Sequence, residues 1–244
     1  MKSLIELTNI SFKLKNIKIL NNINFKIYEG EKIALLGKSG SGKTTLISIL
    51  NGTRRQTSGD IKIYGKSFNK LDNSQKRKLG TIWQDLRLVD DLSAEQNVNV
   101  GLLNNKNLIF TFKNLLNISS FHKAHNCMEL CQLNRSIYSK NIKSISGGQK
   151  QRIAISRSII HEPEILFADE PFNNLDPKLC FYLKNLFISR INNYKIEFPN
   201  TILFSLHKID LIDGFTRVIG LKNGEICLDT KRDELRESDL ENIY

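Results

Sequence analysis

Apolar residues along the chain follow two periodicities, and together these predict an α/β fold. Alternation of period two, typical of half-buried strands, covers the stretch 3–30 and returns at 59–65. These strands are expected to form one antiparallel sheet. Short continuous apolar runs are typical of fully buried strands, and they occur at 32–36, 81–85, 165–170 and 201–205.

Helical spacing, with apolar residues three and four positions apart, separates these strands. The expected helices cover 45–50, 94–139 with an irregular middle, 150–160, 177–190 and 232–244. A further pair of strands flanks Lys222-Asn223-Gly224, which is a hairpin turn signal. The pattern predicts a single domain over 1–244 with a mainly parallel sheet at its core, an N-terminal antiparallel β subdomain, and a helical subdomain inserted at about 94–160.

With 244 residues, the chain is long enough for one sizeable core. Its net charge of +11, from 36 Lys and Arg against 25 Asp and Glu, would suit a nucleic-acid surface. The basic residues are scattered, however, and their longest cluster is Lys76-Arg77-Lys78. A solvated basic surface near anionic lipid therefore fits better than nucleic-acid binding.

No apolar run approaches the roughly 20 residues of a membrane span, and the N-terminus lacks a signal-peptide core. We therefore expect a soluble protein on the reducing side of the membrane, whose four cysteines are small apolar residues rather than disulfides. His122, His125, Cys127 and Cys131 fall within ten residues. On one helix the two pairs point to nearly opposite faces, which argues against a shared metal site.

A glycine-rich segment carries the strongest chemical signal. It reads Gly37-Lys38-Ser39-Gly40-Ser41-Gly42-Lys43-Thr44, between the strand at 32–36 and a helix that continues from Thr45. This context predicts a phosphate-binding loop, because glycines let successive backbone N–H groups turn around an anion and the helix start adds a positive dipole. Lys43 would reach the β- and γ-phosphates of a nucleoside triphosphate, and the Thr44 hydroxyl would ligate Mg²⁺.

Two carboxylates close the buried strand at 165–170. Asp169 would hold Mg²⁺, directly or through water, and Glu170 could accept a proton from attacking water. Polar residues also follow two other strands, with Gln84 ending 81–85 and His207 two residues after 201–205. Side chains at the carboxyl ends of strands face ligands in open α/β sheets, so His207 is a candidate γ-phosphate contact.

Two further helix starts carry polar residues. Ser146-Gly147-Gly148-Gln149 precedes a helix, and it is either a second anion-binding end or a simple N-cap. Asp176 and Pro177 suit the N-cap and first helical positions of the helix at 177–190.

In combination, these motifs resemble those of the ATP-binding-cassette (ABC) ATPases, in the same order and over essentially the whole chain. The matching segments are 37–44, Gln84, 146–149, 165–170, 174–176 and His207. The resemblance implies the fold of a P-loop NTPase of the ABC-ATPase type. It also implies ATP hydrolysis, with ATP and Mg²⁺ bound by the motifs above.

The resemblance assigns a role to each motif. Gln84 would contact Mg²⁺ and sense a membrane partner, and Ser146–Gln149 would bind the γ-phosphate held by a second subunit. Glu170 would be the general base, His207 the switch histidine, and Asp176 an acid at the dimer interface. The implied assembly is a homodimer of ATPase subunits on integral membrane permease subunits, peripheral at the cytoplasmic face, with a substrate-binding protein acting indirectly.

The chain departs from the family pattern at three places. Ile145 stands where leucine is usual, and Asn173-Asn174 where a small residue or serine is common. Leu14 occupies the position that usually offers an aromatic ring to adenine, and the lost stacking amounts to about 0.5–1.5 kcal/mol. Phe12, two residues earlier, could compensate.

A finer resemblance links the chain to the ATPase subunit of phosphonate importers, and it rests on 83–89, 92–98, 218–225 and 239–244. It implies import of a small anion such as phosphonate. The alternative for the same ATPase is an exporter, a lipoprotein-release complex or a cell-division complex. A third reading is a cassette protein that acts on ribosomes or DNA.

Overall fold

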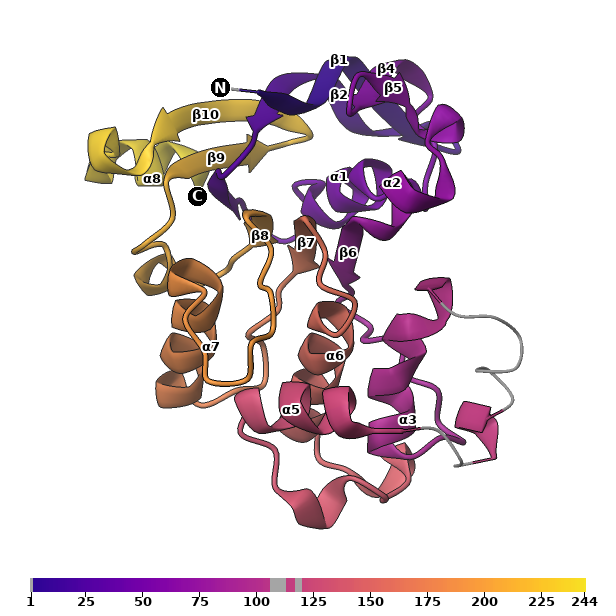
Figure 1. The fold of residues 1–244 in the computed structure, drawn as a ribbon. Helices are drawn as coiled ribbons and strands as arrows, with labels where there is room; N and C mark the ends of the chain where they lie inside the picture. The colour runs from indigo at the N-terminus through magenta and orange to yellow at the C-terminus, as the bar shows by residue number, and fades with distance from the viewer. Residues whose placement is uncertain (1, 106–112, 117–119) are drawn as a thin grey trace. The chain divides into compact units, whose positions relative to one another are not determined.

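The computed structural model describes residues 2–105, 113–116 and 120–244, and Figure 1 shows the course of the chain. Contacts divide the chain into two units. The first contains Met1–Leu79, Phe167–Glu170 and Asn200–Tyr244, and the second contains Gly80–Leu166 and Pro171–Pro199. Each unit is therefore built from segments that are far apart in the sequence.

The N-terminal part of the first unit is an antiparallel sheet of order β2-β1-β4-β5. Its strands are β1 (Ser3–Leu14), β2 (Ile17–Tyr28), β4 (Ser58–Ile63) and β5 (Lys66–Ser67). Ile5 of β1 pairs with Ile27 of β2 and with Ile63 of β4, and all three side chains are fully buried. The alternating apolar residues therefore share one face of an antiparallel sheet, which confirms that prediction.

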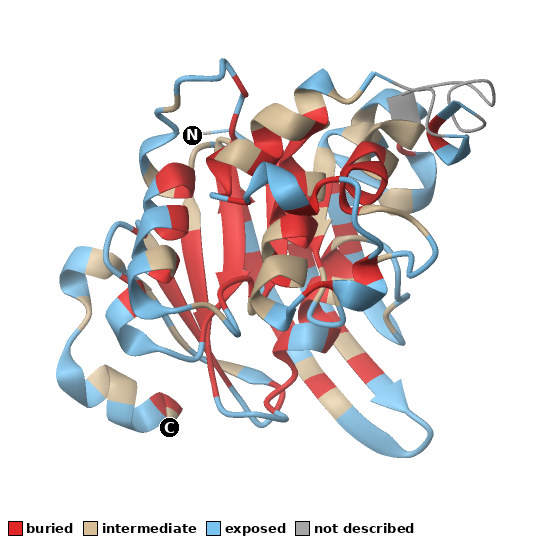
Figure 2. Ribbon diagram, turned by 90° about the horizontal axis from the view of Figure 1, so that it is seen from below, coloured by how far each residue is buried: buried red, intermediate tan, exposed pale blue. Residues whose placement is uncertain are grey.

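A second sheet has the order β10-β9-β3-β8-β7-β6. Its strands are β3 (Lys32–Leu36), β6 (Leu79–Ile82), β7 (Ile165–Asp169), β8 (Thr201–Ser205), β9 (Arg217–Lys222) and β10 (Glu225–Lys231). Strand β3 pairs in parallel with β8 and β9, whereas β10 returns antiparallel to β9 through the predicted hairpin. Every residue of β7 and β8 is buried, and buried strand segments appear red in Figure 2. Strands covered on both faces require such continuous apolar runs.

Short helices complete the first unit. They are α1 (Lys43–Leu50), α2 (Asn73–Arg77) and α8 (Glu237–Ile243), with 3-10 turns η1 (Phe68–Lys70), η5 (Ile209–Leu211) and η6 (Arg232–Glu234). Helix α8 contacts β9 and β10. The prediction of one helix over 232–244 is wrong, because Arg236 is extended between η6 and α8. Asp239 Oδ2 accepts the N–H of Arg236 at 2.9 Å, and this bond starts α8 anew.

The described part of the second unit is mainly helical. Its helices are α3 (Ala94–Asn99), α5 (His122–Leu130), α6 (Gly147–Ile159) and α7 (Pro177–Ser189), with 3-10 turns η2 (Val100–Asn105), η3 (Arg135–Ile137) and η4 (Ile142–Ser144). Helices α3, α5 and α6 contact one another. Within the predicted helical stretch 94–139, residues 106–112 and 117–119 lie outside the described residues.

Several predicted boundaries shift by one to three residues. Strand β6 ends at Ile82, so Gln84 lies in the loop that follows and does not end the strand. Glu170 is outside β7, because its φ of 53° is left-handed. Helix α6 begins at Gly147 and not at 150, because Ser146 already caps it.

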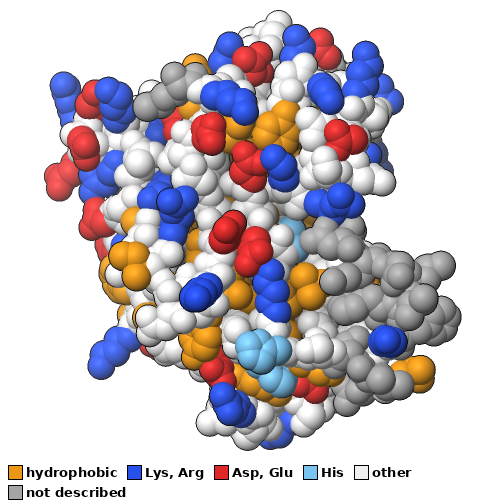
Figure 3. Space-filling model, in the orientation of Figure 1, with side chains coloured by type: hydrophobic (Ala, Val, Ile, Leu, Met, Phe, Trp, Pro, Cys, Tyr) orange, Lys and Arg blue, Asp and Glu red, His pale blue; other side chains and the backbone are white. Residues whose placement is uncertain are grey.

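Within the described residues, no helix combines the length and the apolarity that crossing a bilayer requires. On the face that Figure 3 shows, Lys and Arg side chains are dispersed, with Asp and Glu between them. The basic side chains on this face therefore alternate with acidic ones.

Candidate functional site

The phosphate-loop candidate, 37–44, connects β3 to α1 in the first unit. Gly37 has a φ of 152°, and a Cβ there would lie 2.3 Å from the carbonyl oxygen of Leu221 and 2.6 Å from Ser41 Oγ. Only glycine fits at this point. The Gly224 N–H of the β9–β10 hairpin donates to the Ser41 carbonyl at 3.0 Å, and this bond fixes the loop from outside.

Lys43 begins α1, and its side chain folds back over the loop. Its ammonium donates to the carbonyl oxygens of Gly37 at 2.6 Å and Lys38 at 3.0 Å, and the residue is only 5% exposed. Burial lowers the pKa of Lys43, while the negative charges of Glu170 and Asp169 oppose that change. The loop thus holds a buried cation beside two carboxylates.

Asp169 and Glu170 stand at the end of β7, beside the end of β8. Asp169 is 2% exposed, and its Oδ1 accepts a hydrogen bond from Ser205 Oγ at 2.7 Å. The same Ser205 oxygen accepts the N–H of Glu170 at 2.9 Å. One hydroxyl group therefore contacts both acidic residues.

The carboxylate of Glu170 is bonded to the imidazole of His207, through Oε1 and Nε2. The Glu170 side chain is 9% exposed and that of His207 is 34% exposed, so the pair has one buried and one open partner. The structure thus brings 37–44, Asp169, Glu170 and His207 together in one unit. A phosphate contact and a proton acceptor are both chemically available there.

Asp169 and Thr44 have the oxygen donors that Mg²⁺ prefers. The Oδ2 atom of Asp169 is buried and has no hydrogen-bond partner within the described residues. Thr44 is exposed in the first turn of α1. A buried carboxylate oxygen without a partner is costly unless a ligand satisfies it, so these residues fit a metal ion.

Three further predicted sites lie in the second unit, namely Ser146–Gln149, Asp176 and Gln84. Ser146 is the N-cap of α6, where its Oγ accepts the N–H of Gln149 at 3.4 Å and its own N–H donates to Gln149 Oε1 at 3.2 Å. Gly147 and Gly148 form the first turn. A Cβ on Gly148 would lie 2.8 Å from the carbonyl oxygen of Asn174, so this glycine permits a close approach. The simple N-cap is thus present, and it leaves the helix start with N–H groups and a positive dipole.

Asp176 is the N-cap of α7, and Pro177 is its first residue, as predicted. Asp176 Oδ1 accepts the N–H of Leu179 at 3.0 Å. The residue is exposed, so its carboxylate is also open to a ligand or partner.

Gln84 is exposed in the loop after β6. Arg157 of α6 holds this loop, because its guanidinium donates to the carbonyl oxygen of Arg87 at 2.6 Å and to that of Leu86. Leu86 and Arg87 have φ values of 56° and 47°. Burial lowers the pKa of Arg157 to about 10. Helix α6 therefore begins at the cap Ser146 and, through Arg157 near its other end, contacts the loop that contains Gln84.

Leu14, the predicted adenine contact, ends β1 and is 52% exposed. Phe12 is buried, with the guanidinium of Arg54 5.3 Å from its ring centre. Phe12 therefore has less free surface for a base than Leu14 has.

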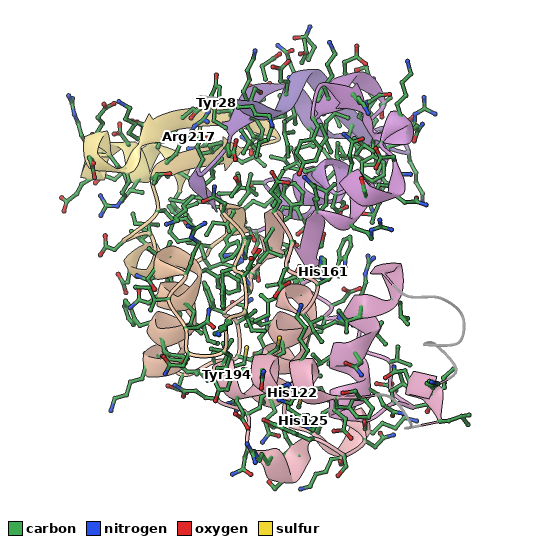
Figure 4. All side chains as sticks on the ribbon, in the orientation of Figure 1. Tyr28, His122, His125, His161, Tyr194 and Arg217 are labelled. Carbon is green, nitrogen blue, oxygen red and sulfur yellow. The ribbon has the colours of Figure 1, made fainter. Side chains whose placement is uncertain are left out.

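The histidines of α5 differ in burial from Cys127 of the same helix and from its C-cap, Cys131. Cys127 and Cys131 are buried, and His122 is exposed. Figure 4 labels His122 and His125. His125 Nε2 lies 2.6 Å from Glu95 Oε2 of α3, and its ring packs on Tyr138 with 4.7 Å between centres. Burial raises the pKa of the Cys131 thiol to about 12. The helical geometry predicted this separation of the two pairs.

Sequence reasoning missed Ser205 and Arg157. Ser205 is the last residue of an apolar strand, and a hydroxyl at that place was the available signal. Arg157 carries no local signal, since its partners Leu86 and Arg87 lie about seventy residues away.

Comparisons with known proteins give a consistent result. The family model described as ABC transporter matches residues 20–173. The chain is 36% identical to the phosphonates import ATP-binding protein PhnC of Fusobacterium nucleatum, over 100% of this chain and 99% of that relative. It is also 36% identical to the lipoprotein-releasing system ATP-binding protein LolD of Wigglesworthia glossinidia brevipalpis, over 87% of this chain and 89% of that relative.

A solved structure shares the fold. It is the dimeric post-hydrolysis state of the ATP-binding cassette MJ0796 bound to ADP and Pi, with 28% identity and a TM-score of 0.78. The match covers 93% of this chain and 98% of that one.

Proposed function

Because the chain belongs to the ABC transporter family and is an ATP-binding subunit that hydrolyses ATP, we propose that its first unit holds the triphosphate and that a second copy completes the site. The predicted fold, a P-loop NTPase of the ABC-ATPase type, is confirmed. The observation that carries the proposal is the array of Lys43, Asp169, Glu170 and His207 in one unit.

Lys43 is the proposed contact to the β- and γ-phosphates. Its ammonium now donates to two loop carbonyls, at 2.6 and 3.0 Å, and a triphosphate would offer charged oxygens in their place. The backbone N–H groups of 38–45 would bind the remaining phosphate oxygens at the start of α1. Leu14, exposed at the end of β1, is the proposed apolar contact to adenine.

Mg²⁺ would be held by Thr44 and by Asp169, whose Oδ2 has no partner in the described structure. When bound, Mg²⁺ neutralises the charge that develops on the phosphates during transfer. Glu170 would accept the proton of the attacking water, and His207 would contact the γ-phosphate while it orients Glu170.

The second copy would supply Ser146–Gln149, in a homodimer of ATPase subunits. Helix α6 has 13 residues, and its partly exposed first turn has the N–H groups and the dipole to bind a γ-phosphate held by the other chain. Asp176, exposed at the start of α7, would lie at the same interface. The dimeric cassette with ADP and Pi supports this arrangement by likeness.

We further propose that the transporter imports a small anion, most simply a phosphonate, through permease subunits that receive it from a substrate-binding protein. The chain would sit peripherally on those subunits at the cytoplasmic face of the membrane. Support comes from the phosphonate-import relative, which matches the whole chain. The lipoprotein-releasing relative, which matches 87% of it, favours the second candidate, a lipoprotein-release ATPase.

The test begins with the membrane protein that copurifies with the chain. The complex is placed in proteoliposomes, and uptake of phosphonate, phosphite and phosphate is measured with and without internal ATP. ATP-dependent phosphonate uptake supports the proposal. A different outcome would be ATP hydrolysis without uptake of any of the three anions, together with release of a lipoprotein from the liposomes. That outcome would support the second candidate function, lipoprotein release, in place of phosphonate import.

A further inference from the structure

The ends of two neighbouring strands meet at one fully buried hydroxyl group. Ser205 is the last residue of β8, and Asp169 is the last residue of β7, the next strand in the sheet. The Ser205 side chain has no solvent exposure. In the described structure its hydroxyl therefore has protein groups, and not bulk solvent, as hydrogen-bond partners.

Both hydrogen-bonding functions of this hydroxyl are used by the acidic residues. Its proton is donated to Asp169 Oδ1 at 2.7 Å, and its oxygen accepts the N–H of Glu170 at 2.9 Å. A hydroxyl has one donor, so Ser205 can bind only one oxygen of Asp169. The other oxygen, Oδ2, is buried and has no partner among the described residues. Ser205 thus makes the two oxygens of Asp169 unequal.

The bond to the backbone of Glu170 has a separate effect. Glu170 has a φ of 53°, which is unfavourable for a residue with a side chain and persists only where contacts hold it. The Ser205 oxygen accepts the N–H of this residue, and its carboxylate contacts His207. Removing the acceptor would take away the hydrogen bond that Ser205 makes to this partly buried N–H, at the point where the chain turns.

We propose that Ser205 is a positioning residue for the metal and for the hydrolytic water: it occupies one oxygen of Asp169, leaves the other for Mg²⁺, and holds the backbone of Glu170. The inference rests on the proposed function, in which Asp169 binds the metal. Ser205 itself contacts neither metal nor nucleotide in this account. Groups that orient metal ligands in this way typically change affinity or activity by about 10–100-fold when they are lost.

The test uses Mn²⁺ as a spectroscopic substitute for Mg²⁺. Binding of Mn²⁺ to the full chain with ATP is titrated by electron paramagnetic resonance for the wild type, Ser205→Ala, Ser205→Thr and Asp169→Asn. Thr201→Val is the matched control, because Thr201 lies at the other end of β8, is equally buried, and accepts the Gly30 N–H at 3.0 Å. Thermal unfolding of each variant is recorded in parallel.

Ser205→Ala is expected to weaken Mn²⁺ binding by about tenfold or more. Ser205→Thr keeps the hydroxyl and is expected to bind Mn²⁺ nearly as well as the wild type. Thr201→Val is expected to change thermal unfolding and to leave Mn²⁺ binding unchanged. If Asp169→Asn weakens binding and Ser205→Ala does not, Ser205 has no positioning role. If Thr201→Val weakens Mn²⁺ binding as much as Ser205→Ala, the effect is one of stability and the inference is overturned. If Asp169→Asn leaves binding unchanged, the metal assignment itself fails. Should Ser205→Thr not fold, the comparison of Ser205→Ala with Thr201→Val decides.

Discussion

Replacement of the proposed base, Glu170→Gln, separates chemistry from nucleotide binding. Glutamine keeps the length and planar end of the side chain, so the contact with His207 can persist as a neutral hydrogen bond. It cannot take a proton from water, and loss of a general base lowers the rate of hydrolysis by about 10²–10⁴-fold. At 1.36 kcal/mol for each tenfold change, the barrier rises by about 3–5 kcal/mol.

The effect on stability is expected to be much smaller. A hydrogen bond to a charged group contributes about 1.5–3 kcal/mol and a neutral one about 0.5–1.5, so the unfolding free energy falls by only about 1 kcal/mol. The 34% exposure of the His207 side chain weakens the pair further through solvent screening. A large loss of rate with a small loss of stability is therefore the signature of a catalytic role.

The assay is phosphate release in single-turnover and steady-state modes, with ATP affinity measured at equilibrium for the same preparations. Glu234→Gln is the matched control, because the Glu234 side chain is 64% exposed and pairs only loosely with Lys231 at 3.6 Å. Hydrolysis by Glu170→Gln at the wild-type rate would refute the assignment. So would an equal loss of ATP affinity and of rate, since the carboxylate would then serve binding.

Three further predictions concern Gly37, Arg217 and Cys227. Gly37→Ala should abolish ATP binding in a calorimetric titration, because its Cβ would lie 2.3 Å from a backbone carbonyl of β9; binding at wild-type affinity would contradict this. Arg217 (Figure 4) donates hydrogen bonds to Asp229 at 2.6 and 2.7 Å and to Glu31 at 3.0 Å. Arg217→Met should therefore lower the unfolding free energy, measured by urea denaturation, by about 3–5 kcal/mol. A loss under about 1 kcal/mol would show that these ion pairs contribute little to stability. Iodoacetamide should label only Cys227 in the native chain, since the other three thiols are buried. Partial burial raises the pKa of Cys227, so its labelling should be slower than that of a free thiol at the same pH. Mass spectrometry counts the labels, and rapid labelling of a second thiol would contradict the packing.

Local patterns predicted most of the fold. The period-two alternation of 3–30, the loop 37–44 with its following helix, and the Asn223-Gly224 turn are all decided by neighbours in sequence, and each is confirmed. Boundaries were less predictable where a single polar bond decides them. Because Ser146 caps it, α6 begins three residues before the predicted start at 150. Because Asp239 bonds to the N–H of Arg236, α8 begins after the predicted start at 232.

Contacts between distant segments could not be predicted from the pattern. Ser205 meets Asp169 across 36 residues of sequence, and Arg157 meets Leu86 across 71. Neither serine at a strand end nor arginine within a helix indicates a partner by itself, because the pairing depends on which strands and helices become neighbours. The order β8-β7 in the sheet supplies that information for Ser205.

The central claim is that the loop 37–44 of the first unit binds ATP through Lys43. Equilibrium binding of ATP to the wild type, Lys43→Ala and the control Lys231→Ala tests it most directly, since the Lys231 side chain is 78% exposed. Loss of one charge-assisted contact of about 1.5–3 kcal/mol predicts a dissociation constant raised by about 10–150-fold for Lys43→Ala, with the control unchanged. Equal affinities for the wild type and Lys43→Ala would contradict the account.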